Sequence, residues 1–220
     1  MSSHHIVREK QEPALILANG QLCDSKILNQ LLEWSPFIIV LDSAFEKVVS
    51  LGIHFDVLLG DFDKINLTEL DKVLPTNVQV VHTPNQDKPD LEKALDYLVE
   101  KGFEAVNILW ATGKRCDHFM NNISLIGRFQ HKLNIVLIDD YSKIYPINSG
   151  FTKYMQANEN ISLMPLNKVT HINTENLVWN LKDSTLEYPF STSISNRVAE
   201  DGLVKIEFKS GILLVMECND

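Results

Sequence analysis

Unbroken apolar runs alternate with amphipathic stretches through the first two-thirds of the chain. The runs lack the apolar-polar alternation of half-exposed strands, which is typical of strands covered on both faces. They are ALILA (14–18), FIIVL (37–41), DVLLG (56–60), VQVV (78–81), AVNILW (105–110) and NIVLI (134–138). The pattern therefore predicts a sheet that is buried on both sides.

Three stretches between these runs, residues 24–34, 89–102 and 117–129, have the spacing of amphipathic helices. In PDLEKALDYLVEKG (89–102), one helical face carries Leu91, Ala94, Leu95, Leu98 and Val99. Gly102 follows as a stop signal. Strands that alternate with helices predict a mostly parallel α/β sheet.

The pattern changes after about Ser149, where short alternating segments are separated by polar or glycine-containing turns. These segments are ENISLMPL (159–166), LVWNL (177–181), TLEYPF (185–190), LVKIEF (203–208) and ILLVMEC (212–218). The last two predict a β-hairpin that turns through Lys209-Ser210-Gly211. We therefore expect an α/β domain over residues 1–149 and a smaller all-β domain over residues 150–220.

Composition indicates the cellular compartment of the protein and excludes some classes of partner. The 220 residues include 20 basic and 29 acidic ones, and the net charge of −9 opposes the basic surface that nucleic-acid binding needs. Cys23, Cys116 and Cys218 have no C-x-x-C spacing, which predicts neither a disulfide framework nor a zinc site and fits a reducing cytoplasm. No apolar run approaches the roughly 20 residues of a membrane span, and the first residues lack a signal-peptide pattern. We expect a soluble cytoplasmic protein without nucleic-acid or membrane partners.

Polar residues follow most of the predicted strands of the α/β domain. The segments that follow them are Asn19-Gly20, Asp42-Ser43, Asp61-Phe62-Asp63, Ala111-Thr112-Gly113 and Asp139-Asp140. In open parallel sheets, ligands bind outside the carboxyl ends of the strands. We therefore expect a binding site at this edge of the sheet.

Two of these polar residues, Asp61 and Asp63, suggest a metal ion. In an extended segment their carboxylates would project to one side and Phe62 to the other. Two nearby carboxylates repel each other unless a cation lies between them. Oxygen ligands of this kind suit Mg²⁺, and Asp90, at the start of a predicted helix, is a third candidate ligand. The alternative is that Asp61 and Asp63 are turn or helix-cap residues, since Asp favours both roles.

The segment ATGKRCDHFMNN (111–122) follows another predicted strand and resembles a phosphate cradle. The Thr112-Gly113 turn leads into a helix start, and helix N-termini and backbone N–H groups attract anions. Arg115 offers a planar fork to phosphate oxygens. Asp117 has the alternative role of a helix N-cap, and His118 that of a packed surface histidine. Neither a P-loop nor a dinucleotide-binding fingerprint is present in the sequence.

Four motifs occur in the order found in thiamin pyrophosphokinases, and the chain resembles this family over nearly its whole length. The motifs are GDFDKI (60–65), TPNQDKPDLEKAL (83–95), TGKRCDH (112–118) and LVWNL followed by STSISN (177–196). The resemblance implies a Rossmann-like α/β domain followed by a β-sandwich, in a homodimer whose sites lie between subunits. It also implies transfer of the pyrophosphoryl group of ATP to the hydroxyl of thiamin with Mg²⁺, which gives thiamin diphosphate and AMP.

The resemblance also implies roles for the acidic residues. Asp61, Asp63 and Asp90 would hold Mg²⁺ and the ATP phosphates. Asp42 and Asp117 would complete the acidic cluster, and one acidic residue, with Asp117 as the candidate, would accept the proton of the thiamin hydroxyl.

Other matched positions would contact the two substrates. Arg115 would face a nucleotide phosphate, and Gln86 would lie near the substrate. Ser195 and Asn196 match a Ser-Asn pair that would contact the aminopyrimidine of thiamin across the dimer. Trp179 either stacks on the cationic substrate, since indole faces attract cations, or is a core residue of the sandwich.

The chain departs from the family pattern at several places. The family usually has Gly-Gly at Ser43-Ala44, Ser at Lys64, Thr at Pro89, and Gly at Trp110 and Lys114. Small residues allow a ligand to approach the backbone closely, so Ser43 and Trp110 bear on how the nucleotide would lie. Two rival functions stay open: a pyrophosphokinase of similar architecture for another heterocyclic alcohol, such as a pterin, and a non-catalytic protein that binds nucleotide or thiamin diphosphate.

Overall fold

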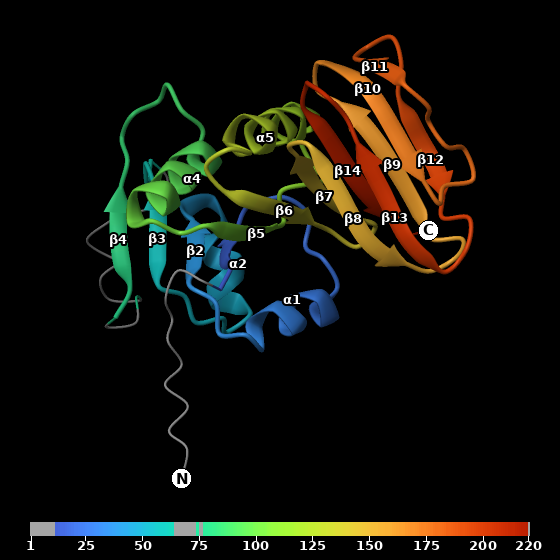
Figure 1. Cartoon of the computed structure of the whole chain (residues 1–220). Helices are drawn as coiled ribbons and strands as arrows, with labels where there is room; N and C mark the ends of the chain where they lie inside the picture. Colours follow the sequence, from blue (N-terminus) through green and yellow to red (C-terminus); the bar gives the residue numbers. More distant parts are fainter. Residues whose placement is uncertain (1–11, 64–73, 75–76, 220) are drawn as a thin grey trace. The chain divides into compact units, whose positions relative to one another are not determined.

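The computed structural model describes residues 12–63, 74 and 77–219 (Figure 1). Lys64, one of the departures from the family pattern, lies outside the described residues. The chain divides into two compact units, Met1–Phe119 and Met120–Asp220. The domain boundary that the sequence pattern places near residue 149 stays a prediction.

The first unit contains a parallel sheet in the order β5-β1-β2-β3-β4. Its strands are β1 (Ala14–Leu17), β2 (Ile38–Leu41), β3 (Val57–Gly60), β4 (Gln79–His82) and β5 (Ala105–Leu109). Its helices are α1 (Ser25–Leu32), the 3-10 turn η1 (Asp42–Ala44), α2 (Phe45–Ser50), α4 (Asp90–Lys101) and the beginning of α5 (Cys116–Phe129). Figure 1 shows α1 and α2 on one face of this sheet and α4 on the other, as right-handed crossovers on either side of β1 require. The parallel α/β sheet is confirmed.

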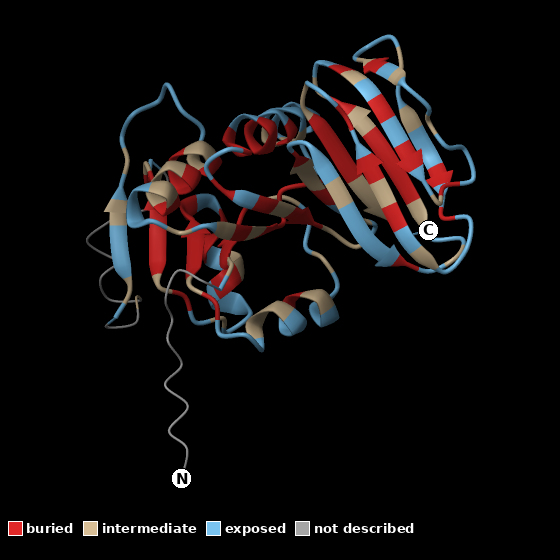
Figure 2. Ribbon diagram, viewed as in Figure 1, coloured by how far each residue is buried: buried red, intermediate tan, exposed pale blue. Residues whose placement is uncertain are grey.

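Burial matches the apolar runs at β1, β2 and β3 but not at β4. Every residue of β1, β2 and β3 is buried (Figure 2). In β4, by contrast, Gln79, Val80 and His82 are exposed and Val81 is half-buried. The expectation that VQVV is covered on both faces is therefore wrong, because β4 is the last strand in the order and pairs with β3.

Helix α4 follows the predicted pattern closely. It begins at Asp90, directly after Pro89, and ends at Gly102, whose φ of +75° is the left-handed conformation that glycine favours at a helix end. The predicted apolar face is buried, with Val99 half-buried at its margin. Lys93 is buried as well, which the pattern did not predict.

The second unit is built from antiparallel strands in two sheets. One has the order β12-β9-β14-β7-β6 and the other the order β11-β10-β13-β8. The strands are β6 (Asn134–Ile138), β7 (Ser142–Ile147), β8 (Gly150–Met155), β9 (Asn160–Pro165), β10 (Lys168–Glu175), β11 (Ser184–Glu187), β12 (Ser193–Arg197), β13 (Gly202–Glu207) and β14 (Leu213–Cys218). Leu163 and Val215 from the first sheet share one buried core with Ile172 and Ile206 from the second. This is the expected β-sandwich.

The predicted hairpin between the last two segments is wrong. Strand β13 pairs with β8 and β10, whereas β14 pairs with β7 and β9 in the other sheet. The connection bonds to β10 instead of closing a turn: the N–H of Thr170 donates to the carbonyl of Ser210 at 3.1 Å, and the N–H of Lys209 donates to Thr170 at 2.9 Å. Gly211 (φ +111°) then crosses the backbone of Lys168 so closely that a Cβ would lie 2.4 Å from its carbonyl oxygen. The segment thus leads from one sheet to the other.

Two further findings bear on the predictions. The LVWNL segment is a turn around Val178 and Trp179 and not a strand. Among the helices that the structure describes, none has both the length and the apolar character needed to cross a bilayer.

Candidate active site

Asp42 lies at the carboxyl end of β2 and is buried against the end of β3. Its carboxylate accepts the backbone N–H of Ser43 and that of Phe62, the latter at 3.0 Å. A Cβ at Gly60 would lie 2.2 Å from Cγ of Asp42, so only glycine lets the carboxylate lie against this strand. Burial raises the pKa of Asp42, the two backbone hydrogen bonds oppose this shift, and the nearby carboxylates of Asp90 and Asp61 add to it.

We expected the Asp61-Phe62-Asp63 segment to be extended. Instead, it turns at Phe62. Phe62 has a φ of +57° and is 5% exposed, and its ring centroid lies 5.9 Å from that of His82. The N–H of Asp63 donates to Oδ1 of Asp61 at 3.2 Å, which closes a local turn. The buried phenyl ring anchors this turn and leaves the two aspartates at the surface.

Both carboxylates nevertheless point toward one atom. Nε2 of Gln86 donates to Oδ2 of Asp61 at 3.0 Å and lies 3.4 Å from Oδ2 of Asp63. The pKa of Asp61 is lowered, chiefly by the hydrogen bond from the N–H of Asp63, and the side chains of Gln86 and Lys93 contribute. Asp61 is therefore an ionised carboxylate that accepts hydrogen bonds from the N–H of Asp63 and from Gln86.

Asp90 belongs to the same cluster but has its own partner. Nζ of Lys93 donates to Oδ1 of Asp90 at 3.1 Å and to the carbonyl of Thr83 at 2.9 Å. Lys93 is 8% exposed. Sequence reasoning missed it, although a lysine beside the apolar face of α4 must find partners when that face is buried.

The cluster of Asp42, Asp61, Asp63 and Asp90 offers carboxylate oxygens, which are donor atoms that suit a hard cation. Among the residues that the structure describes, no three His, Cys, Asp or Glu side chains are assembled as a metal-binding group. Two carboxylate oxygens do converge on the amide nitrogen of Gln86, and oxygen atoms of this kind are the ligands that Mg²⁺ prefers. The residues present fit the ion, and the ligand set of Asp61, Asp63 and Asp90 stays a prediction.

The loop after β5 has an unusual backbone. Trp110, Gly113 and Lys114 have φ values of +58°, +69° and +54°. The family usually has glycine at Trp110 and Lys114, and here these are left-handed positions that glycine favours. The Trp110 side chain is 1% exposed, so it points into the core and does not cover the site.

Arg115 and Asp117 form an exposed pair at the start of α5. Nε of Arg115 donates to Oδ1 of Asp117 at 3.0 Å, and Nη2 donates to the other carboxylate oxygen. This pairing lowers the pKa of Asp117 to about 2. Because α5 begins at Cys116, Asp117 lies within the first turn of the helix and not at its cap. Thr112 is buried, and its carbonyl accepts the N–H of Gln21 at 2.9 Å.

The three candidate residues of the second unit lie together but differ in accessibility. Trp179 is 56% exposed, so its interpretation as a core residue is wrong, and the guanidinium of Arg197 lies 6.0 Å from its ring centroid. Ser195 is exposed and has a φ of +55°. Asn196 is 2% exposed: its amide donates to the carbonyl of Trp179 at 2.8 Å and accepts the N–H of Trp179 at 3.2 Å and that of Arg197 at 2.9 Å. Asn196 therefore holds the Trp179 turn in place.

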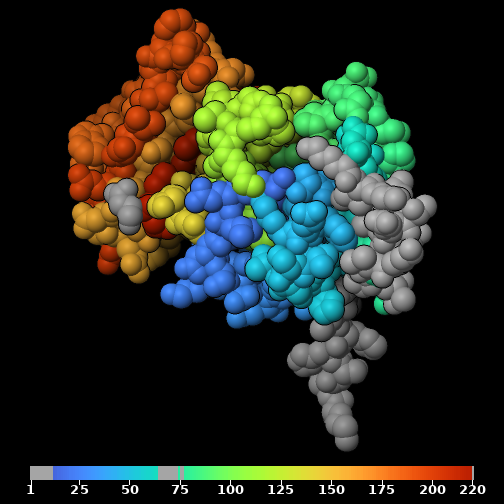
Figure 3. Space-filling model, turned by 180° about the vertical axis from the view of Figure 1, so that it is seen from behind, coloured from blue at the N-terminus to red at the C-terminus, as the bar shows by residue number. Residues whose placement is uncertain are grey.

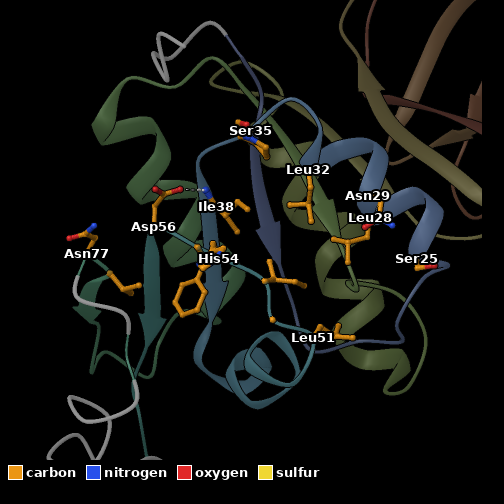
Figure 4. A pocket seen from close by; sticks show the side chains of 15 residues that line it. Ser25, Leu28, Asn29, Leu32, Ser35, Ile38, Leu51, His54, Asp56 and Asn77 are labelled. Carbon is orange, nitrogen blue, oxygen red and sulfur yellow. Dashed lines mark hydrogen bonds between the residues drawn. The ribbon is translucent and has the colours of Figure 1, made fainter. Parts of the chain in front are cut away.

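A pocket of about 820 Å³ lies elsewhere, at the amino ends of β2 and β3 (Figure 4). It is lined by Leu28 and Leu32 of α1 and by Ile38, His54 and Asp56, and Asp56 accepts the N–H of Ile38 at 2.9 Å. None of the predicted site residues lines it. We place the site at the opposite edge, because the carboxylates and cations gather there and ligands of open α/β sheets bind there.

Comparison with known proteins connects both units to one family. The model of "Thiamin pyrophosphokinase, catalytic domain" matches residues 28–137, and that of "Thiamin pyrophosphokinase, vitamin B1 binding domain" matches residues 150–213. The thiamine pyrophosphokinase of Bacillus subtilis (strain 168) is 28% identical over 189 residues, which are 82% of this chain and 86% of that protein. Thiamine pyrophosphokinase 1 of Oryza sativa subsp. japonica is 28% identical over 171 residues, which are 72% of this chain but 64% of the rice protein.

Solved structures show the same fold. The crystal structure of the Bacillus subtilis thiamine pyrophosphokinase matches with a TM-score of 0.82 and 24% identity, over 95% of this chain and all of that one. The thiamin pyrophosphokinase of Candida albicans matches with a TM-score of 0.78 at 15% identity, over 94% of this chain and 90% of that one. Because the two family models match in order and the first alone spans half of the sequence, the chain belongs to the thiamin pyrophosphokinase family.

Proposed function

We propose that the chain is a thiamin pyrophosphokinase, which transfers the pyrophosphoryl group of ATP to the hydroxyl of thiamin and releases AMP. Family membership supports this activity. One geometric observation carries it: in a chain of this family, the carboxylate oxygens of Asp61 and Asp63 converge on one point beside Asp42 and Asp90.

The proposed nucleotide site uses Asp61, Asp63 and Asp90 to hold Mg²⁺ together with the ATP phosphates. A bound Mg²⁺ supplies neutralisation of phosphate charge. The amide of Gln86 lies where the oxygens of Asp61 and Asp63 converge, and from this position it would contact the substrate. Lys93 would keep Asp90 in place and balance part of the negative charge.

The chain's own residues contribute positioning more than covalent chemistry, as phosphoryl-type transfer requires. Arg115 offers its guanidinium to a phosphate, and Asp117 orients it through two hydrogen bonds. A carboxylate with a pKa of about 2 is a weak proton acceptor, so this pairing favours a positioning role for Asp117 over the role of base. Asp42 is fixed by backbone hydrogen bonds and shapes the floor of the site.

The proposed thiamin contacts come from the second unit. Trp179 presents an exposed indole to the cationic thiazolium, and the guanidinium of Arg197 already lies over this ring as a cation would. The exposed hydroxyl of Ser195 would contact the aminopyrimidine. Asn196 acts indirectly, since its amide groups are used to hold the Trp179 turn.

We further propose a cytoplasmic homodimer in which each thiamin site is completed by the partner subunit. Several exposed apolar side chains surround the Trp179 turn in the sequence, and such groups favour a protein interface. They are Val178, Tyr188, Phe190 and Ile194. Cys23, Cys116 and Cys218 form no disulfide with one another, which is the state that a reducing compartment favours.

Product analysis tests the proposal. The protein is incubated with ATP, Mg²⁺ and thiamin, and we expect equal amounts of thiamin diphosphate and AMP. A pterin alcohol is assayed in parallel, and AMP formation with the pterin but not with thiamin would favour the rival pyrophosphokinase. Binding of thiamin diphosphate in calorimetry without any AMP formation would favour the non-catalytic alternative.

A further inference from the structure

Two lysine ammonium groups meet above the carboxyl end of β1. Nζ of Lys47, on α2, donates to the carbonyl of Gly20 at 2.9 Å. Nζ of Lys114, on the loop after β5, donates to the carbonyl of Asn19 at 2.9 Å and lies 3.4 Å from its Oδ1. The two ammonium groups are neighbours, since the side chain of Lys114 acts directly on that of Lys47.

The ion pairs that the structure describes leave both lysines out. Burial, and after it the neighbouring Lys114, lowers the pKa of Lys47 to about 8. The two ammonium groups repel each other, and a bound anion would remove that repulsion.

Lys114 is also held in an unfavourable backbone conformation. Its φ of +54° lies in the left-handed region, where a side chain is strained and glycine is not. The lysine therefore brings its charge toward Lys47 against both backbone preference and electrostatic repulsion, which points to a ligand that needs both charges.

The surface beneath the two lysines is rigid. The N–H of Ala18 donates to Leu109 at 3.0 Å, and those of Gly20 and Gln21 donate to Trp110 and Thr112. A Cβ at Gly20 would lie 2.3 Å from the carbonyl oxygen of Thr112, so the two loops are in direct backbone contact. Figure 3 shows the blue segment after β1 and the yellow-green segment after β5 lying against each other.

The lysine pair lies at the same edge of the sheet as the acidic cluster. Strand β1 lies between β5 and β2 in the sheet order, whereas Asp42 follows β2 and Asp61 follows β3. The edge thus has a negative part, suited to a metal ion, and a positive part formed by the two lysines, beside the Arg115–Asp117 ion pair after β5. A nucleotide phosphate chain needs both kinds of neutralisation.

We propose that Lys47 and Lys114 form a phosphate-binding pair that holds one phosphate group of the nucleotide directly, without a metal ion. The inference rests on the proposed function, and it adds two binding residues to the site. Lysine ammonium groups bind phosphate as point charges, and two of them on fixed carbonyls are pre-organised for it. The phosphate comes either from the pyrophosphoryl group that is transferred or from the AMP that leaves.

Calorimetry with two probes distinguishes these sources. Inorganic pyrophosphate and AMP are titrated separately into the full chain, with EDTA present and thiamin absent. We expect Lys47→Met and Lys114→Gly each to weaken binding of at least one probe about tenfold or more, since each removes a charge-assisted hydrogen bond. The probe affected identifies the phosphate group. Lys101→Met, which removes a lysine that lies over the Tyr97 ring on α4, is the control and should stay within about twofold.

Thermal unfolding tests whether weaker binding results from a less stable fold. Lys114→Gly places glycine at a left-handed position that glycine favours, so its unfolding temperature should not fall while its affinity does. Affinities within about twofold of the unaltered protein for both probes in both variants would overturn the proposal, as would failure of the unaltered protein to bind either probe at millimolar concentration. If Lys47→Met does not fold, Lys114→Gly decides. Thiamin diphosphate formation is assayed separately, so an inactive protein with lysine-dependent binding would contradict the proposed function alone.

Discussion

Asp42 and Phe62 are joined by a hydrogen bond from the backbone N–H of Phe62 to the carboxylate of Asp42, 3.0 Å long, which ties the end of β2 to the turn after β3. Gly60 permits this bond, because any larger residue would overlap the carboxylate. The bond and the buried Phe62 ring together fix the turn that presents Asp61 and Asp63.

Gly60→Ala should therefore disturb the site and the fold together. The new methyl group would lie 2.2 Å from Cγ of Asp42, and relief of such overlap in a packed region costs about 1–3 kcal/mol. We expect a lower free energy of unfolding in urea and slower AMP formation. Gly150→Ala is the control, since its nearest contact would be an ordinary 3.7 Å from a carbonyl oxygen. Equal stability of Gly60→Ala and the unaltered protein would contradict this account of Gly60.

Asp61→Asn should remove activity without removing stability. The carboxylate is exposed enough to lose its charge at little cost to folding, but the proposed metal site would lose a ligand. We expect the rate of AMP formation to fall about 10²- to 10³-fold, judged from the loss of a single electrostatic contact in other active sites. Asp87→Asn changes an aspartate of the neighbouring 83–89 loop outside the cluster and should keep its rate. A near-normal rate for Asp61→Asn at saturating Mg²⁺ would show that this residue is not a ligand.

Trp179→Ala separates substrate contact from packing. A core tryptophan would cost about 3–5 kcal/mol on truncation, whereas Trp179 is 56% exposed. We expect the free energy of unfolding to change by less than about 1 kcal/mol, mainly from the lost contact with Arg197. The KM for thiamin should rise while the KM for ATP stays the same. A parallel rise in both constants would argue against a thiamin contact.

Unlike Trp179→Ala, Asn196→Ala should mainly lower the free energy of unfolding. It leaves the backbone N–H and carbonyl of Trp179 without their partner in a partly buried place, which costs about 1–3 kcal/mol. We expect lower stability in urea and a change in Trp179 fluorescence, because the turn is no longer held. Ser195→Ala is the control for stability, since this neighbouring side chain is exposed. If Asn196→Ala left stability unchanged and raised only the KM for thiamin, Asn196 would be a direct substrate contact.

Local patterns in the sequence predicted the elements that depend on local physics. Helix α4 was predicted from its apolar face and from Gly102, because both act within a few residues of each other. The hairpin prediction failed at Gly211 because pairing of β13 and β14 with other strands depends on contacts distant in sequence. The exposure of β4 was missed for the same reason, since sheet order decides which strand is at the edge.

In the candidate site, too, features with a local sequence signal were predicted, and features that depend on distant contacts were missed. The aspartates were predicted because they follow apolar runs, and the left-handed backbone at Trp110 and Lys114 agrees with glycine being the usual family residue there. Lys47 and Lys93 were missed, because a lysine on a helix gives no local sign of the backbone carbonyl that it will contact. Their partners come from loops that the fold, and not the sequence spacing, brings near.

Lys47 gives a pH dependence of stability with a defined sign. Its pKa is lowered from 10.5 to about 8 in the folded chain, chiefly by burial and then by Lys114. Between these values the unfolded chain binds more protons than the folded one, so the free energy of unfolding should rise with pH. Measured by urea denaturation from pH 7 to pH 10, the stability of the unaltered protein should therefore increase relative to that of Lys47→Met. Lys114→Gly should reduce this increase without abolishing it, because burial remains. Pyrophosphate bound to the lysine pair should make this rise in stability with pH smaller, since the anion stabilises the charged ammonium. If the difference in the free energy of unfolding between the unaltered protein and Lys47→Met did not change with pH, the lowered pKa of Lys47 would be contradicted.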